Sequence, residues 1–114
     1  MEFLVMAKDG SDAEALGRRK RTRPSHLASI GPLVDSGNVL VGGAILDDAG
    51  DMIGSMLLVD FPDRTGVDAW LAADPYVTEG VWRDIEVTPI RTGASPAGSV
   101  ARSPRPKGDR CSSW

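Results

Sequence analysis

Two apolar segments separated by a short polar turn place the strongest constraint on how this chain can fold. Residues 38–46 and 52–60 are rich in Val, Leu, Ile and Met, and residues 47–51 between them comprise three Asp, one Ala and one Gly. A polar turn of this length that contains Gly is typical of a hairpin between antiparallel strands. The sequence therefore predicts a central β-hairpin, with a bulge or a close backbone approach at Gly42-Gly43 in its first strand.

The segments on either side of the hairpin complete a recognisable order of elements. Apolar runs predict a first strand at residues 3–7 and a last strand at residues 81–90. Apolar residues at helical spacing after Pro24, namely Leu27, Ile30 and Val34, predict a first helix. A second helix is predicted after Asp63, a candidate N-cap, with Val67, Trp70 and Leu71 on its apolar face. The order β-α-β-β-α-β is the split βαβ arrangement of ferredoxin-like folds in the α+β class.

This order predicts two layers, with two helices covering one face of a four-stranded antiparallel sheet. The other face carries several apolar side chains and needs a cover, and a second copy of the chain is the simplest one, so we expect a homodimer. We assign one domain to residues 1–90. Residues 91–114, in which Gly, Ala, Ser, Pro and Arg dominate, are predicted to be a flexible tail.

The first helix contains two prolines. Pro24 suits its first turn, and Gly37 suits the position after its C-terminus. Gly31-Pro32 lies inside the segment and removes a backbone hydrogen bond, so we expect a kink or a break there. Residues 11–22 are mostly polar, and the basic run within them, Arg18-Arg19-Lys20-Arg21, is interpreted as a solvated loop.

The last strand is predicted to have one polar face. Strand alternation places Val81, Ile85 and Val87 on one side. The opposite side carries Trp82, Asp84, Glu86 and Thr88. A face of this composition suits a cavity or a wet interface.

The formal net charge of −3 hides an asymmetry along the chain. Residues 1–90 carry eight Lys/Arg against fifteen Asp/Glu, whereas residues 91–114 carry five against one. An acidic body repels phosphate backbones and anionic lipids, so neither nucleic acid nor a membrane is the expected partner. No apolar run approaches the roughly 18 residues of a membrane span, and the N-terminus lacks the pattern of a signal peptide, so the expected compartment is the cytoplasm.

Cysteine and histidine usage excludes several kinds of chemistry. Cys111 is the only cysteine, so no disulfide can form within the chain, and no histidine lies near it in sequence to activate it. One His and one Cys cannot make a zinc site, and the acidic turn at residues 47–51 lacks the ligand spacing of a calcium loop. The glycine patterns that cradle phosphates are absent. We therefore expect neither a metal nor a cofactor.

His26, Asp74 and Arg23 are the candidates for chemistry. His26 is the only histidine and lies on the edge of a predicted apolar stripe, where part of its ring faces a cleft. Asp74 ends the second helix, where the helix dipole disfavours a carboxylate, so a cationic partner or a proton is expected. Arg23 could hold an anionic substrate group. The structural alternatives are a packed histidine, a turn residue before proline and a solvated arginine.

Four short motifs follow one another along the chain: Arg23-Pro24-x-His26-Leu27, Gly37-x-x-Leu40-x-x-Gly43, Ala73-Asp74-Pro75-Tyr76-Val77-x-x-Gly80-Val81 and Val87-x-Pro89. Their order and spacing over residues 2–90 resemble the YCII (YciI-like) family. The resemblance implies a dimeric α+β barrel, in which two ferredoxin-like sheets close face to face, with an active site built from His26 and Asp74. This family is similar to muconolactone isomerase and to cofactor-free monooxygenases, and one related activity eliminates HCl from a chlorinated hydroxyquinol. The Gly31-Pro32 interruption and the basic tail depart from the family pattern.

Two hypotheses for function follow. The first is a cofactor-independent enzyme of the lyase or isomerase type, in which Asp74 orients His26 and the pair moves a proton on a small cyclic or aromatic metabolite. Arg23, Tyr76 and Trp82 are then the candidate substrate-binding residues. The second is a non-catalytic dimeric module that binds a small-molecule ligand or a partner protein, with the tail that carries Cys111 and Trp114 as the contact.

Overall fold

The computed structural model describes residues 1–93, in which strands and helices follow the predicted order with one short helix added. The elements are β1 (Glu2–Asp9), α1 (Ala15–Asp35), β2 (Val39–Leu46), β3 (Met52–Asp60), α2 (Arg64–Ala73), α3 (Pro75–Thr78) and β4 (Trp82–Ile90). All paired strands are antiparallel, and the sheet order is β2-β3-β1-β4. The predicted ferredoxin-like α+β fold is therefore confirmed. The predicted tail, apart from residues 91–93, lies outside the described residues, as do Cys111 and Trp114.

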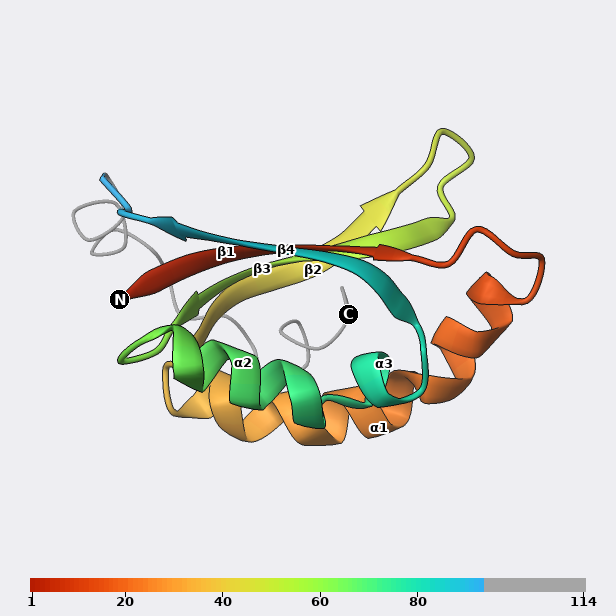
Figure 1. Ribbon diagram of the computed structural model, residues 1–114. Helices are drawn as coiled ribbons and strands as arrows, with labels where there is room; N and C mark the ends of the chain where they lie inside the picture. The colour runs from red at the N-terminus through yellow and green to blue at the C-terminus, as the bar shows by residue number, and fades with distance from the viewer. Residues whose placement is uncertain (94–114) are drawn as a thin grey trace.

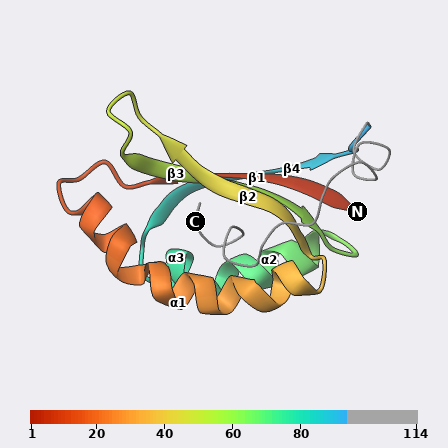
Figure 2. The ribbon, with the colours of Figure 1, turned by 180° about the vertical axis from the view of Figure 1, so that it is seen from behind.

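The three helices lie together on one face of the sheet (Figure 1), and the view from behind shows the same two layers (Figure 2). Phe3 and Val5 of β1 and Leu57 and Val59 of β3 project toward the helices and are at most 2% exposed. Val67 and Trp70 of α2, among others, pack against them in one core cluster. Among residues 1–93, no helix covers the opposite face of the sheet.

The central hairpin forms where the sequence places it. The Asp47 carboxylate accepts hydrogen bonds from the backbone N–H groups of Ala49 and Asp51, which closes the turn. The predicted bulge at Gly42-Gly43 is wrong, because the register of β2 shifts on either side of these residues, between Val39 and Val41 and between Ile45 and Leu46. A Cβ at Gly43 would meet no atom within 4 Å, whereas a close backbone approach is found at Gly54 of β3.

The first helix is longer than predicted. α1 begins at Ala15, so Pro24 lies in its interior and not in its first turn as predicted, and residues 18–21, which were interpreted as a loop, are helical. Gly31-Pro32 does not break the helix, which continues to Asp35. Both prolines are exposed, so the carbonyl groups that lose a helical donor lie on the solvent side, where water can satisfy them. Both views show the first turns of α1 at an angle to the rest (Figures 1 and 2). Gly37 follows the helix with a φ of 85°, as predicted.

The last strand departs from simple alternation at its start. The pairing of β1 with β4 shifts between Lys8 and Asp9, so that Lys8 pairs with Asp84 whereas Asp9 pairs with Trp82. This irregularity turns Trp82 toward the core, where it is 3% exposed. The prediction that Trp82 shares the polar face of the strand is therefore wrong, while Asp84, Glu86 and Thr88 are exposed.

The second helix begins and ends as predicted. The Asp63 side chain accepts a hydrogen bond from the backbone N–H of Gly66 and caps the helix N-terminus. The chain then enters α3 at Pro75, a helix of one turn that the sequence analysis did not predict. Within the described part of the chain, no helix is long and apolar enough to cross a membrane.

The close approach at Gly54 yields a stability prediction. A Cβ at this position would collide with the carbonyl oxygen of Ala7 on the neighbouring strand, whereas a Cβ at Gly43 would meet no atom within 4 Å. We expect Gly54→Ala to lower the free energy of unfolding by about 1–3 kcal/mol, and Gly43→Ala to leave it unchanged or slightly raised. Urea denaturation of both variants is the measurement. Equal stability of the two variants would contradict the strand packing described here.

Candidate functional site

His26 and Asp74, which lie far apart in the sequence, meet between α1 and the end of α2. The His26 Nδ1 lies 2.8 Å from the Asp74 Oδ1, and neither side chain is exposed to solvent. The structure thus brings together the two residues that the motifs singled out. The prediction that part of the His26 ring faces a cleft is wrong, because the whole residue is 0% exposed.

The Asp74 carboxylate is held by groups from three helices. Besides the His26 contact from α1, its Oδ2 accepts a hydrogen bond of 3.1 Å from the Trp70 Nε1 of α2. Its Oδ1 accepts a bond of 2.9 Å from the backbone N–H of Tyr76, because Asp74 is also the N-cap of α3. The N-terminus of α3 thus stabilises the carboxylate and compensates for its unfavourable position at the C-terminal end of the α2 dipole.

This arrangement fixes the orientation and the tautomer of the imidazole. An indole N–H and a backbone N–H can only donate, so each oxygen of Asp74 accepts at least one bond, which is the pattern of an ionised carboxylate. An ionised carboxylate has no proton to give, and the His26 Nδ1 must therefore carry the proton of the third bond. In a neutral ring, the lone pair then lies on Nε2, on the opposite side of the imidazole.

Aromatic rings surround the imidazole. The Tyr76 ring stacks on it, with centroids 3.9 Å apart and an interplanar angle of 9°. The Trp82 ring meets it edge-on at 5.6 Å and 71°. Both predicted substrate-binding aromatics therefore contact His26, but Tyr76 is 0% and Trp82 only 3% exposed, so in this state they form a packed wall.

A second buried ion pair lies beside the first, and sequence analysis missed it. Arg19 donates to both oxygens of the Asp9 carboxylate, at 3.0 and 3.1 Å, and its side chain is fully buried. Its Nη2 also donates to the Ser55 Oγ, which accepts a further bond from the Trp82 Nε1. The interpretation of residues 18–21 as a solvated loop is therefore wrong for Arg19. The sequence did carry one signal of this burial: Arg19 lies two helical turns before His26 and therefore on the same face of α1.

Tyr76 connects the two ion pairs. The Arg19 guanidinium lies 5.0 Å from the centroid of the Tyr76 ring, which also stacks on His26. Burial raises the pKa of Tyr76, against the opposing effect of the Arg19 and Arg23 charges. Arg23, the predicted anion-binding residue, is half-buried on α1 and acts on Tyr76 through this charge. Burial also raises the pKa of Asp9, although the neighbouring Arg19 lowers it.

The fold and the site together define a class. The chain is a ferredoxin-like domain with a buried His–Asp pair under one end of its sheet. Within residues 1–93, no three His, Cys, Asp or Glu side chains form a group suited to hold a metal ion. The model of the YCII-related domain matches residues 1–91, and the chain belongs to this family.

Curated and solved relatives agree with this assignment. The chain is 33% identical over 97 residues to Protein YciI of Escherichia coli O6:H1, which covers 80% of this chain and 97% of that protein. A solved structure, 5-chloro-2-hydroxyhydroquinone dehydrochlorinase (TftG) from Burkholderia phenoliruptrix AC1100 in complex with 2,5-dihydroxybenzoquinone, is 28% identical, with a TM-score of 0.71 and coverage of 82% of this chain and 96% of that one. Rv0793 from Mycobacterium tuberculosis, at 16% identity and a TM-score of 0.51 over 81% of this chain and 98% of that one, shares the fold alone.

The three donors around Asp74 lead to a prediction. An Asn side chain has one oxygen and one NH2 group, so either orientation in Asp74→Asn sets the NH2 group against an obligate donor, Trp70 Nε1 or Tyr76 N–H. We expect this substitution to lower the free energy of unfolding by about 1–3 kcal/mol in urea denaturation. Asp68→Asn on the exposed face of α2 is the matched control, and a variant Asp74→Asn as stable as this control would refute the donor assignment.

Proposed function

We propose that this chain is a cofactor-independent enzyme of the lyase or isomerase type. In this proposal, His26 is the general acid/base and Asp74 is the carboxylate that orients it. The substrate is a small cyclic or aromatic metabolite from which a proton is removed, or to which one is added.

The observation that carries the proposal is the way in which Asp74 is held. A general base works when its tautomer and orientation are fixed before the substrate arrives. Here one carboxylate, anchored by Trp70 and by the Tyr76 backbone, keeps the His26 Nδ1 protonated and leaves Nε2 as the basic atom. Such a base can accept a proton from carbon or from a phenolic oxygen of a bound ring.

The 28% identical dehydrochlorinase supports the reaction type. Its name describes loss of HCl from a chlorinated hydroxyquinol, a reaction in which a proton and a chloride ion leave the same molecule. A base of the His–Asp type suits the proton step. For the present chain we carry over the class of a hydroxylated ring, and not that particular substrate.

The burial of His26 sets a condition on this chemistry. The His26 Nε2 is buried, so the substrate reaches it only after some of the covering side chains move. The best-placed element to move is α3, because it has one turn and carries Tyr76, which stacks directly on the imidazole. Lids of this kind commonly gate enzyme sites.

Replacement of the base tests the proposal. A panel of hydroxylated and chlorinated hydroxylated rings, assayed for proton exchange with solvent D2O and for chloride release, identifies a turned-over compound. On that compound, His26→Gln should lower kcat by about 10²-fold or more, the usual contribution of a general acid/base. Lys20→Gln, an exposed change on the same helix, is the control. Unchanged turnover by a folded His26→Gln protein would contradict the proposal that His26 is the general acid/base.

The second candidate is a non-catalytic dimeric binding module, and the complete burial of His26 favours it. In that case the His–Asp pair only holds α1 against α2 and α3. The two candidates predict different solvent exchange of the His26 ring in the ligand-free protein. A gating site allows the His26 ring to exchange with solvent on the millisecond scale, whereas a purely structural pair keeps it closed.

Both candidates include a homodimer that forms through the open face of the sheet. Alternation in β1, and the register of its neighbours, place Leu4, Met6, Met56, Leu58 and Val41 on this face. Met6 is 39% and Val41 44% exposed, although both are apolar. A second sheet packed against this face would remove these side chains from water, which is the main driving force for association.

A charge placed in the middle of this face tests the dimer. The full chain of 12.1 kDa should sediment at twice that mass. Met6→Lys should sediment as a monomer, because a packed interface would remove water from the lysine charge without giving it a partner. Ala69→Lys, on the exposed side of α2, should remain dimeric. A monomeric wild type, or a dimer unaffected by Met6→Lys, argues against this interface.

A further inference from the structure

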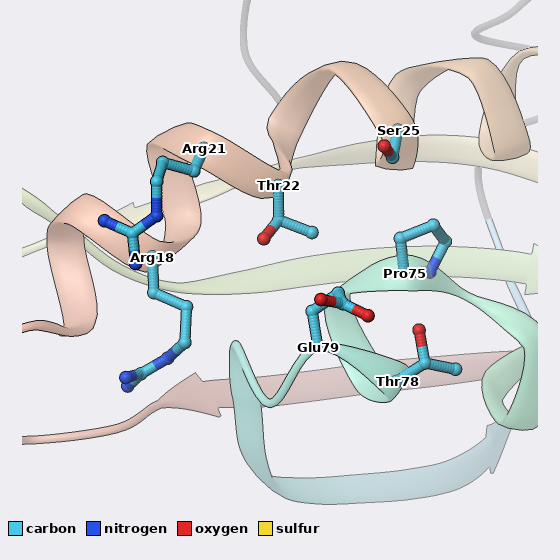
Figure 3. Close-up of a pocket in the computed structure, with 7 residues that line it drawn as sticks. All are labelled: Arg18, Arg21, Thr22, Ser25, Pro75, Thr78 and Glu79. Atoms are coloured by element: carbon cyan, nitrogen blue, oxygen red, sulfur yellow. The ribbon is translucent and has the colours of Figure 1, made fainter.

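A polar pocket lies between α1 and α3, beside the buried pair, and has no role in the chemistry described so far. Its volume is about 470 Å³, within the usual size range of ligand pockets. The residues that line it are Arg18, Arg21, Thr22, Ser25, Pro75, Thr78 and Glu79. The first four come from one face of α1 and the last three from α3 and its C-cap (Figure 3).

The pocket adjoins the His–Asp pair through the same two segments of chain. Thr22 lies one helical turn before His26 and is 8% exposed, so it belongs both to the buried stripe of α1 and to the pocket wall. Ser25 directly precedes His26, and Pro75 directly follows Asp74. The pocket therefore lies beside the α1–α3 contact in which Tyr76 stacks on the imidazole.

The charges in the pocket are divided between its two sides. Arg18 and Arg21 lie at one end, whereas Glu79 turns its carboxylate from the α3 side toward α1 (Figure 3). Arg18 is engaged by Asp12 through two hydrogen bonds of 2.8 and 3.2 Å. Arg21 folds back over Gly17, and among residues 1–93 its guanidinium makes no hydrogen bond or ion pair. One guanidinium and one carboxylate are thus available to a ligand.

These two groups specify complementary ligand chemistry. A guanidinium only donates hydrogen bonds and prefers an anionic oxygen, and an ionised carboxylate only accepts them. The hydroxyl groups of Thr22, Ser25 and Thr78 between them can do either, and the Pro75 ring offers an apolar edge. A ligand that satisfies the pocket therefore carries a negative oxygen at one end and a neutral hydroxyl at the other.

We propose that the pocket between α1 and α3 is the substrate-docking subsite, in which Arg21 holds an ionised oxygen and Glu79 accepts a bond from a neutral hydroxyl on a small ring. The assignment of this ligand as substrate rests on the proposed function, whereas its binding does not. It narrows the substrate class to hydroxylated ring compounds that carry one negative charge. It also explains how an acidic protein selects an anion, because Arg21 presents a local positive charge.

The probes are 4-hydroxybenzoate and benzoate, which differ only in the hydroxyl group. Titration of the full chain, followed by backbone amide NMR, should shift residues of α1 and α3 around the pocket. Arg21→Gln should weaken 4-hydroxybenzoate binding by about tenfold, and Lys20→Gln, which removes the same charge one residue away, should not. Glu79→Gln should strengthen benzoate binding, because it removes a like charge, and reduce the preference for 4-hydroxybenzoate.

The outcomes separate this inference from the proposed function. Absence of pocket shifts in the wild type, or equal affinity of Arg21→Gln and Lys20→Gln, overturns the subsite whatever the turnover data show. If His26→Gln binds 4-hydroxybenzoate normally and retains turnover on an identified substrate, the subsite stands and the role of His26 fails. Normal binding with lost turnover in His26→Gln, together with weakened binding in Arg21→Gln, supports both.

Discussion

The Asp74 carboxylate is the point on which the helical layer depends. It accepts one hydrogen bond from each of three helices: from His26 of α1, from Trp70 of α2 and from the Tyr76 backbone of α3. A buried carboxylate is costly unless each lone pair that faces the protein is satisfied. Once satisfied, it connects the three helices of the layer. The short α3 in particular has few buried residues of its own, and its start is defined by the Asp74 cap.

The neighbouring pair of Arg19 and Asp9 has a different character. A buried ion pair adds little net stability, because desolvation of the two charges offsets most of their attraction. The rise in the pKa of Asp9 shows the same balance, since burial outweighs the nearby guanidinium. The pair nevertheless fixes where the Arg19 charge sits, with Ser55 as a third contact and the Tyr76 ring beneath it. The site therefore has a positive group on one side of Tyr76 and an imidazole stacked on the same ring.

The sequence predicted the sheet better than it predicted the first helix, and the reason is physical. The two apolar segments and the polar turn between them were sufficient to predict the hairpin. The register shift at Lys8 and Asp9, which turns Trp82 inward, comes from pairing with a distant strand and leaves no local signal. In α1, a basic run concealed a buried position, since Arg19 is stabilised by Asp9 and not by hydrophobic burial. His26 and Asp74 were each singled out from the sequence, as the only histidine and as a carboxylate at a helix C-terminus, but their pairing came only from the motif resemblance.

The buried stripe of α1 has two halves of different composition. Its members, at regular helical spacing, are Ala15, Arg19, Thr22, His26 and Ile30. The C-terminal half packs against the core through Ile30, with Leu27, Leu33 and Val34 partly buried beside it. The N-terminal half buries Arg19, Thr22 and His26, which contribute far less hydrophobic stabilisation than aliphatic residues would. A helix that needed only to cover the sheet would continue the aliphatic stripe. The polar half contains His26 and borders the α1–α3 pocket, so aliphatic packing and buried polar side chains are divided along its length.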